Sequence, residues 1–152
     1  MYNILIHGTD KLHEYEELVK VFLPTDEFHL HGDTDLAAEV DSALKMDAVF
    51  PFEGDKNRLK YQLYQFLGSI TGKQPPWGII TGIRPVKLTG EILRKDGDTL
   101  LVQKILTNDF LVSEKKARQA IEMVYYQLQS AGTPKTGSVS VYVGIPFCPS
   151  RC

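Results

Sequence analysis

Two short apolar runs on either side of a helical pattern constrain the fold of this chain most. Residues 2–7 (YNILIH) are rich in Ile and Leu and predict a buried strand, and residues 28–31 alternate apolar and polar side chains as a second strand does. Between them, apolar side chains recur at the spacing of one helix face: Leu12, Tyr15, Leu18, Val19 and Phe22. Thr9 or Asp10 is expected to cap this helix, and Pro24 to end it. The pattern therefore predicts a small α/β unit.

We place this unit at residues 1–54, because two more elements fit the same pattern. Residues 33–45 carry apolar side chains at helical spacing, and residues 48–52 predict a short strand. Pro51 cannot donate a backbone hydrogen bond, so this strand is expected at an edge of the sheet.

From residue 55 to residue 132 the pattern is helical. Each expected helix has a start or stop signal: Gly72 after the first, Pro85 at the start of the second, and Asp98 and Ser113 before the last two. The apolar stripes of these helices run over residues 59–70, 86–92, 101–106 and 117–128.

Charge and cysteine content exclude several classes of protein. The chain has 152 residues and a formal net charge of −2, which gives no electrostatic reason to expect binding to nucleic acid or to an anionic membrane. It has no apolar run of transmembrane length and no secretory signal pattern. Its two cysteines are too few for a disulfide scaffold, so we expect a cytoplasmic protein.

Both cysteines lie in a segment of distinctive pattern, residues 133–152. After a Gly- and Pro-containing linker, residues 138–147 alternate Val and Ile with other residues and predict a strand. Cys148 and Cys152 follow on a short loop with two prolines, so their thiolates can converge on one inorganic centre. A zinc site would need two further donors, which His29 and His31 would have to supply. The alternative is a pair of surface thiols, or a disulfide formed on oxidation.

At this point the sequence resembles a known family. YVGIPFCPSRC resembles the entrance to the cluster loop of radical S-adenosylmethionine enzymes, whose full pattern is Cys-x3-Cys-x2-Cys. Together with WGIITGIRPVKL, it is similar to the N-terminal part of the oxygen-independent coproporphyrinogen III dehydrogenases of the HemZ type. The resemblance implies an α/β (α+β) chain whose residues 133–152 hold the first strand of a truncated radical S-adenosylmethionine (βα) barrel.

The resemblance also implies a cofactor set and a reaction. Cys148 and Cys152 match the first two ligands of a 4Fe–4S cluster, whose free iron would bind S-adenosylmethionine. Tyr142 matches a tyrosine that contacts S-adenosylmethionine. The implied reaction is the oxidative decarboxylation of coproporphyrinogen III to protoporphyrinogen IX in haem biosynthesis, with a porphyrinogen substrate and an electron donor protein as partners. Gly144 stands where many members carry histidine, so a haem-handling relative without this activity is an alternative.

The third cluster ligand of the family would lie three residues past Cys152. We therefore expect the chain to be an N-terminal fragment of a longer enzyme and to be inactive alone. A non-catalytic interaction module, formed by residues 1–137, is the alternative from another functional class.

Three further groups have a functional and a structural interpretation, and for each we favour the structural one. Gly82, Arg84 and the helix start at Pro85 would suit an anion, but Gly78 and Gly82 equally permit a tight turn that Trp77 anchors. The remaining groups are typical of solvated faces: the pair His29 and His31, and the basic cluster Lys115, Lys116 and Arg118.

Overall fold

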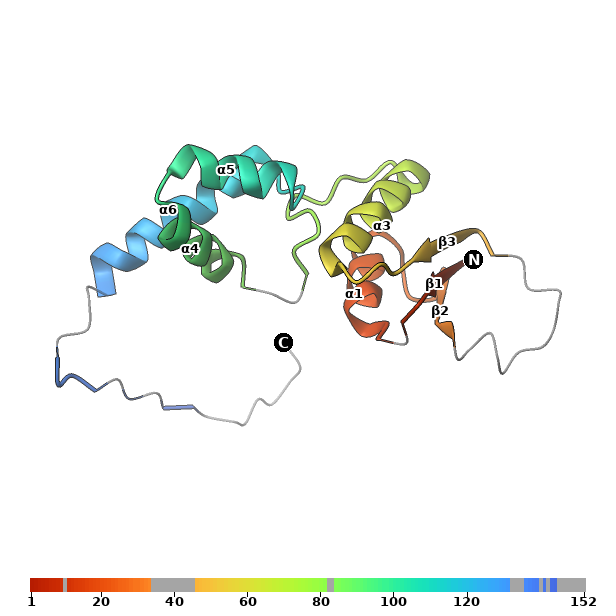
Figure 1. Ribbon diagram of the computed structural model, residues 1–152, viewed down its shortest axis with the longest axis horizontal. Helices are drawn as coiled ribbons and strands as arrows, with labels where there is room; N and C mark the ends of the chain where they lie inside the picture. Colours follow the sequence, from red (N-terminus) through yellow and green to blue (C-terminus); the bar gives the residue numbers. More distant parts are fainter. Residues whose placement is uncertain are drawn as a thin grey trace.

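The computed structural model describes residues 1–9, 11–33, 46–81, 84–131, 136–139, 141 and 143–144 (Figure 1). The elements follow one another as β1 (Tyr2–His7), α1 (His13–Phe22), β2 (Phe28–His31), β3 (Ala48–Pro51), α3 (Lys56–Thr71), α4 (Pro85–Asp96), α5 (Thr99–Asn108) and α6 (Glu114–Ala131). This arrangement of a small sheet and helices confirms the predicted α/β class. The helix expected over residues 33–45 lies almost wholly outside the described residues.

The three strands form one parallel sheet in the order β2-β1-β3. The central strand is the most buried one, and Ile4 and Ile6 in it are completely buried. β3 is an edge strand, as Pro51 predicted, and its partner residue there is His7. β1 and β2 can be parallel because α1 carries the chain back between them.

Helices α1 and α3 pack beside this sheet and on each other (Figure 1). Their apolar stripes meet in one core, where Phe22 lies edge-on to Tyr64 with ring centroids 5.1 Å apart. The completely buried side chains of the two helices in this core include Leu18, Val19, Leu63 and Leu67. Gly72 ends α3 in the left-handed conformation, as expected.

Helices α4, α5 and α6 surround a second core. Pro85 is in the first turn of α4, and the Asp98 carboxylate caps α5 by accepting a hydrogen bond from the backbone N–H of Leu100 at 2.8 Å. Both signals were predicted. The buried side chains of this core are Ile80, Val102, Leu106, Val112, Ala117 and Ile121.

Two local predictions are wrong among the described residues. Leu12 is the N-cap of α1, and the Thr9 hydroxyl accepts from the backbone N–H of Lys11 at 3.1 Å instead of capping the helix. The described residues between 138 and 144 form no strand, and Val139, Val141 and Val143 are each more than 80% exposed. A strand needs a neighbour to pair its backbone, and no described strand lies beside this segment. None of the described helices is at once long and apolar enough to cross a bilayer.

Candidate functional site

The residues that the resemblance assigns to the cofactors, Tyr142, Cys148 and Cys152, lie outside the described part of the chain. Gly144 is described and exposed. The cluster-ligand assignments therefore stay predictions, and the site that can be built from contacts lies in the helical part of the chain.

The segment Trp77–Ile80 joins the two cores. The backbone N–H of Ile79 donates to the carbonyl of Phe110 at 2.9 Å, and that of Ser113 donates to the carbonyl of Pro76 at 3.0 Å. Gly78 lies between these bonds with φ +58°, buried against the facing chain. The turn that it makes and the partly buried indole of Trp77 fit the structural interpretation of WGIITGIRPVKL. Gly82 lies outside the described residues.

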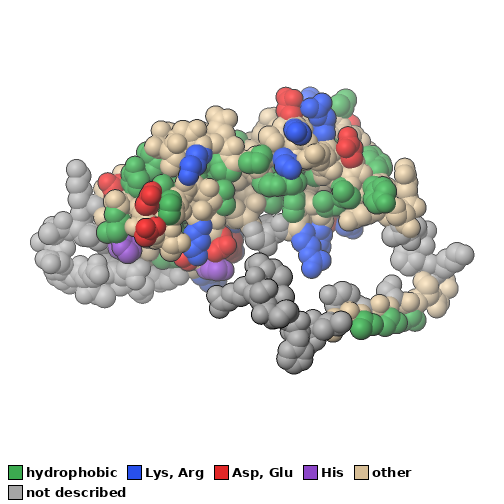
Figure 2. Space-filling view, turned by 180° about the vertical axis from the view of Figure 1, so that it is seen from behind, with side chains coloured by type: hydrophobic (Ala, Val, Ile, Leu, Met, Phe, Trp, Pro, Cys, Tyr) green, Lys and Arg blue, Asp and Glu red, His purple; other side chains and the backbone are tan. Residues whose placement is uncertain are grey.

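Trp77 also lines a surface groove of about 560 Å³. Val86 at the start of α4 and one face of α6 complete it, and the lining side chains are Trp77, Val86, Gln119, Ala120, Glu122, Met123 and Tyr126. Met123 is 46% exposed and Tyr126 65% exposed, so large apolar side chains remain open to solvent here. Seen from behind, hydrophobic and basic side chains adjoin one another on this half of the molecule (Figure 2). Sequence periodicity could place these residues on helices but could not show that they border a groove.

One lysine lies over the Trp77 ring, although it is not among the side chains that line the groove. The ammonium of Lys116 lies 5.3 Å from the centroid of the Trp77 ring, within the range of a cation–π interaction. Lys116 is half-buried, whereas Lys115 and Arg118 beside it are exposed. The sequence interpretation as a solvated face thus fits Lys115 and Arg118 but not Lys116.

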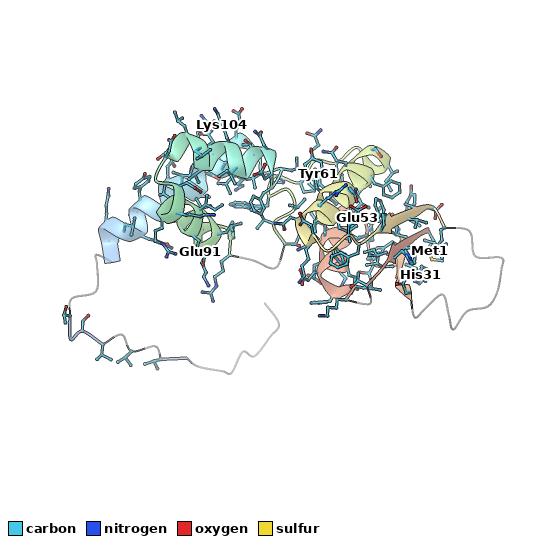
Figure 3. All side chains as sticks on the ribbon, viewed as in Figure 1. Met1, His31, Glu53, Tyr61, Glu91 and Lys104 are labelled. Atoms are coloured by element: carbon cyan, nitrogen blue, oxygen red, sulfur yellow. The ribbon has the colours of Figure 1, made fainter. Side chains whose placement is uncertain are left out.

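The histidines do not form a metal site with other described residues. The rings of His29 and His31 are 6.2 Å apart, and His31 Nε2 lies 3.4 Å from the amide oxygen of Asn3. No group of three or more potential metal ligands occurs among the described residues. Figure 3 shows His31 at the sheet, away from the helices of the second core. The interpretation as a solvated face remains the simpler one.

His7 is the last residue of β1, and Asp33 follows the carboxyl end of β2. The Asp33 carboxylate is 2.6 Å from His7 Nδ1 and accepts from the backbone N–H of Gly8 at 2.8 Å. These hydrogen bonds, first that from Gly8, lower the pKa of Asp33. His7 is well exposed, and the pair ties the chain after β2 to the end of β1.

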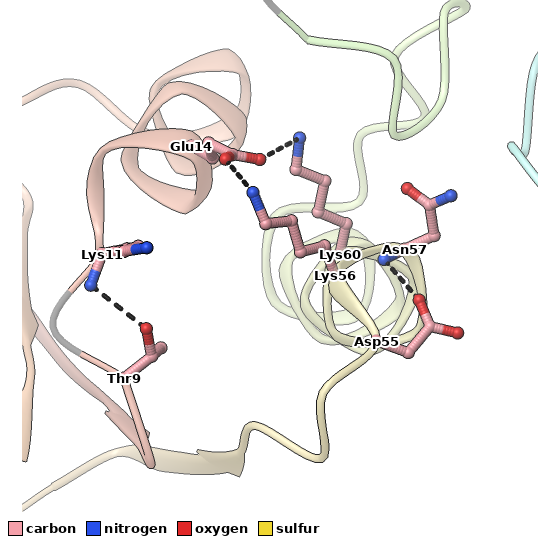
Figure 4. Close-up of polar contacts among 7 residues, drawn as sticks. All are labelled: Thr9, Lys11, Glu14, Asp55, Lys56, Asn57 and Lys60. Atoms are coloured by element: carbon pink, nitrogen blue, oxygen red, sulfur yellow. Dashed lines mark hydrogen bonds and ion pairs between the residues drawn. The ribbon is translucent and has the colours of Figure 1, made fainter.

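Lys60 is a buried cation that sequence reasoning missed. Its side chain is only 6% exposed between α1 and α3, and its ammonium lies 3.8 Å from a carboxylate oxygen of Glu14 (Figure 4). Burial lowers the pKa of Lys60, and the nearby Glu14 carboxylate opposes part of that effect. Glu14 also pairs with Lys56, whose hydrogen bond lowers the pKa of Glu14. The sequence did contain one indication that Lys60 is buried: it precedes the buried Tyr64 by four residues and so lies on the same face of α3.

Replacing Lys60 by methionine is therefore expected to raise the free energy of unfolding by about 1 kcal/mol at neutral pH, because an apolar chain of similar length needs no desolvation. The folded-state pKa of Lys60 is below the ordinary 10.5, so the stability of the unsubstituted chain rises as the pH approaches 10.5. The difference in free energy of unfolding between K60M and the unsubstituted chain should shrink over the same pH range. Urea unfolding at several pH values measures this, with Lys104→Met at an exposed position as the control. A loss of stability in K60M would show that the pair with Glu14 outweighs the cost of burial.

Comparison with known proteins gives one match. Over 105 residues the chain is 36% identical to the "Oxygen-independent coproporphyrinogen-III oxidase-like protein HemZ" of Bacillus subtilis (strain 168). The match covers 66% of this chain but 21% of the relative, so the chain spans about a fifth of the relative's length. No family model and no solved structure matches. Over the matched residues, the chain is a distant and partial homologue of this coproporphyrinogen-III oxidase-like protein.

Proposed function

We propose that this chain is the N-terminal part of a longer radical S-adenosylmethionine oxidoreductase that acts on a porphyrinogen in haem biosynthesis. In this proposal Cys148 and Cys152 are two of the three thiolate ligands of a 4Fe–4S cluster, and Tyr142 contacts S-adenosylmethionine. The reaction is the oxidative decarboxylation of coproporphyrinogen III to protoporphyrinogen IX.

The observation that carries the proposal is the 36% identity with the coproporphyrinogen-III oxidase-like protein, whose name states an oxygen-independent oxidase-like character. A chance similarity of composition does not extend over 105 residues at this level. The cysteine pattern adds support, because the segment YVGIPFCPSRC resembles the cluster loop of radical S-adenosylmethionine enzymes.

The donor set fits such a cluster in chemical type. Thiolates are the usual protein ligands of iron–sulfur clusters, and the spacing of Cys148 and Cys152 lets both reach one centre. When bound, the cluster would supply the one-electron chemistry that starts the reaction on S-adenosylmethionine. The role proposed for the chain is to present the two thiolates on a loop that its prolines restrict.

The proposal is tested on the longer protein, purified and reconstituted with iron and sulfide without oxygen. After one-electron reduction of the cluster with dithionite, we expect a 4Fe–4S signal in electron paramagnetic resonance that changes when S-adenosylmethionine is added. Incubation with coproporphyrinogen III and a reductant should then give a product with vinyl groups, identified by mass spectrometry. A protein that takes up no cluster under these conditions contradicts the enzymatic proposal.

A second candidate is favoured by Gly144, which stands where many coproporphyrinogen-converting enzymes carry histidine. In that case the longer protein binds the cluster and handles haem or a porphyrin without decarboxylating it. The same incubation separates the two, because this candidate forms a cluster but no vinyl product.

A further inference from the structure

The carboxyl-terminal end of α6 extends beyond the core that buries the rest of the helix. Among the described side chains of α6, that of Val124 is the last buried one, and it lies against Gly90 of α4. Residues 125–130, here called the α6 end, are all exposed, although the apolar stripe of the helix continues through Leu128. Figure 1 shows this blue end of α6 extending past α4 and α5. An apolar stripe that continues past its core is typical of a surface that another element covers.

The side chains of the α6 end are large and uncharged. Tyr126 is 65% exposed and Leu128 57% exposed. The hydroxyl of Tyr125 lies 3.0 Å from that of Thr99 on α5, yet this tyrosine is still 43% exposed. The other residues of 125–130 are two glutamines and a serine. Because solvated helix faces carry charged side chains and interface cores are depleted in them, the α6 end has the composition of an interface.

The absence of charge continues along the chain after α6. Between residues 123 and 150 the only charged side chain is that of Lys135, in a chain with 24% charged residues. Val139, Val141 and Val143 in this stretch are each more than 80% exposed. Uncovered apolar surface is thus concentrated along the stretch by which the chain leaves α6. Since consecutive elements of a chain usually lie side by side, the polypeptide that follows is the partner that this surface fits.

We propose that the α6 end is the docking surface for the part of the longer protein that follows residue 152. The inference rests on the proposed function only in requiring that the chain continue, and it does not depend on the reaction. The chain spans about a fifth of its relative's length, so in a protein of similar length most of the polypeptide is available to cover this surface. A short covalent connection keeps that polypeptide at high effective concentration, so a modest apolar contact is enough for docking.

Hydrogen exchange followed by mass spectrometry tests this on the longer protein, with the 152-residue chain as the reference. We expect the backbone amides of residues 125–130 to exchange at least about tenfold more slowly in the longer protein, because docking suppresses fraying of the helix end. The amides of residues 63–67 in α3, which lie in the other core, should exchange at the same rate in both.

Leu128→Ser in the longer protein should speed exchange at residues 125–130 roughly fivefold, because it removes apolar contact with the docked part. The matched control is Leu100→Ser, which replaces a 69% exposed leucine of α5 and should leave the protection unchanged. In the 152-residue chain, L128S should alter the exchange rates by less than about twofold, which separates loss of docking from loss of helix propensity.

Equally fast exchange of residues 125–130 in the longer protein and in the 152-residue chain would overturn the proposal. So would an L128S longer protein, folded by circular dichroism, that keeps its full protection. Protection that appears in the 152-residue chain as its concentration is raised would also contradict it, because the surface would then bind a second copy.

The cluster signal separates this proposal from the proposed function. A longer protein without a cluster but with slow exchange at the α6 end contradicts only the proposed function. One that forms the cluster and the vinyl product but exchanges fast there contradicts only the docking of the α6 end.

Discussion

Replacement of Gly78 by alanine is expected to lower the free energy of unfolding by about 4 kcal/mol or more. A Cβ built on Gly78 falls 2.0 Å from the carbonyl oxygen of Phe110 and 2.4 Å from the carbonyl carbon of Leu111. These are backbone atoms, which cannot rotate away as a side chain does. Alanine at this position therefore requires the two chain segments to separate, with loss of the hydrogen bond from Ile79 to Phe110.

The effect extends to both cores, because Phe110 packs against each of them. Leu111 already has a φ of +56°, which is uncommon for a leucine and is held by the packing of this turn. Displacing residues 110–111 thus releases apolar contacts on both sides of the junction. We expect urea unfolding of the Gly78→Ala variant, followed by circular dichroism, to start at much lower denaturant than that of the unsubstituted chain.

Gly97→Ala is the matched control. Gly97 has φ +70°, so alanine meets the same kind of backbone strain, but no heavy atom lies within 4 Å of its built Cβ. Its expected cost is about 1 kcal/mol, from the left-handed conformation alone. Equal losses for the two variants would mean that strain, and not the contact with residues 110–111, sets the requirement for glycine at position 78.

The sequence predicted those parts of the fold that local chemistry determines. The stop at Gly72, the start at Pro85 and the cap at Asp98 were all predicted, because each acts within one helical turn. The cap at Thr9 was predicted wrongly, since a hydroxyl near a helix start can bond a nearer N–H instead.

Contacts between distant segments were the part that sequence reasoning did not supply. The apolar periodicity of α3 predicts a helix but does not show which other element the helix packs against. Nothing in the sequence around Lys60 shows that this lysine faces α1. The groove likewise depends on Trp77 and Tyr126 meeting across 49 residues of chain. For the segment with Cys148 and Cys152 the opposite holds: the sequence motif predicts binding of an iron–sulfur cluster, and the packing of the described residues does not test that prediction.

The second large expected effect is loss of the proposed iron–sulfur cluster when either cysteine is replaced. In the longer protein that we propose, Cys148→Ala and Cys152→Ala should each abolish the S-adenosylmethionine-sensitive cluster signal and the formation of a vinyl product. Each removes one of three thiolate ligands, and two thiolates do not hold a 4Fe–4S cluster against loss of iron. Iron and sulfide per protein, measured after anaerobic reconstitution, should fall to the background level in both variants.

Ser150→Ala, between the two cysteines, is the matched control, since it changes the same loop without removing a sulfur. It should keep the cluster. A cysteine variant that keeps its iron and its signal would show that the sulfurs are not ligands. The match to the coproporphyrinogen-III oxidase-like protein would then support relatedness without cluster chemistry at these residues.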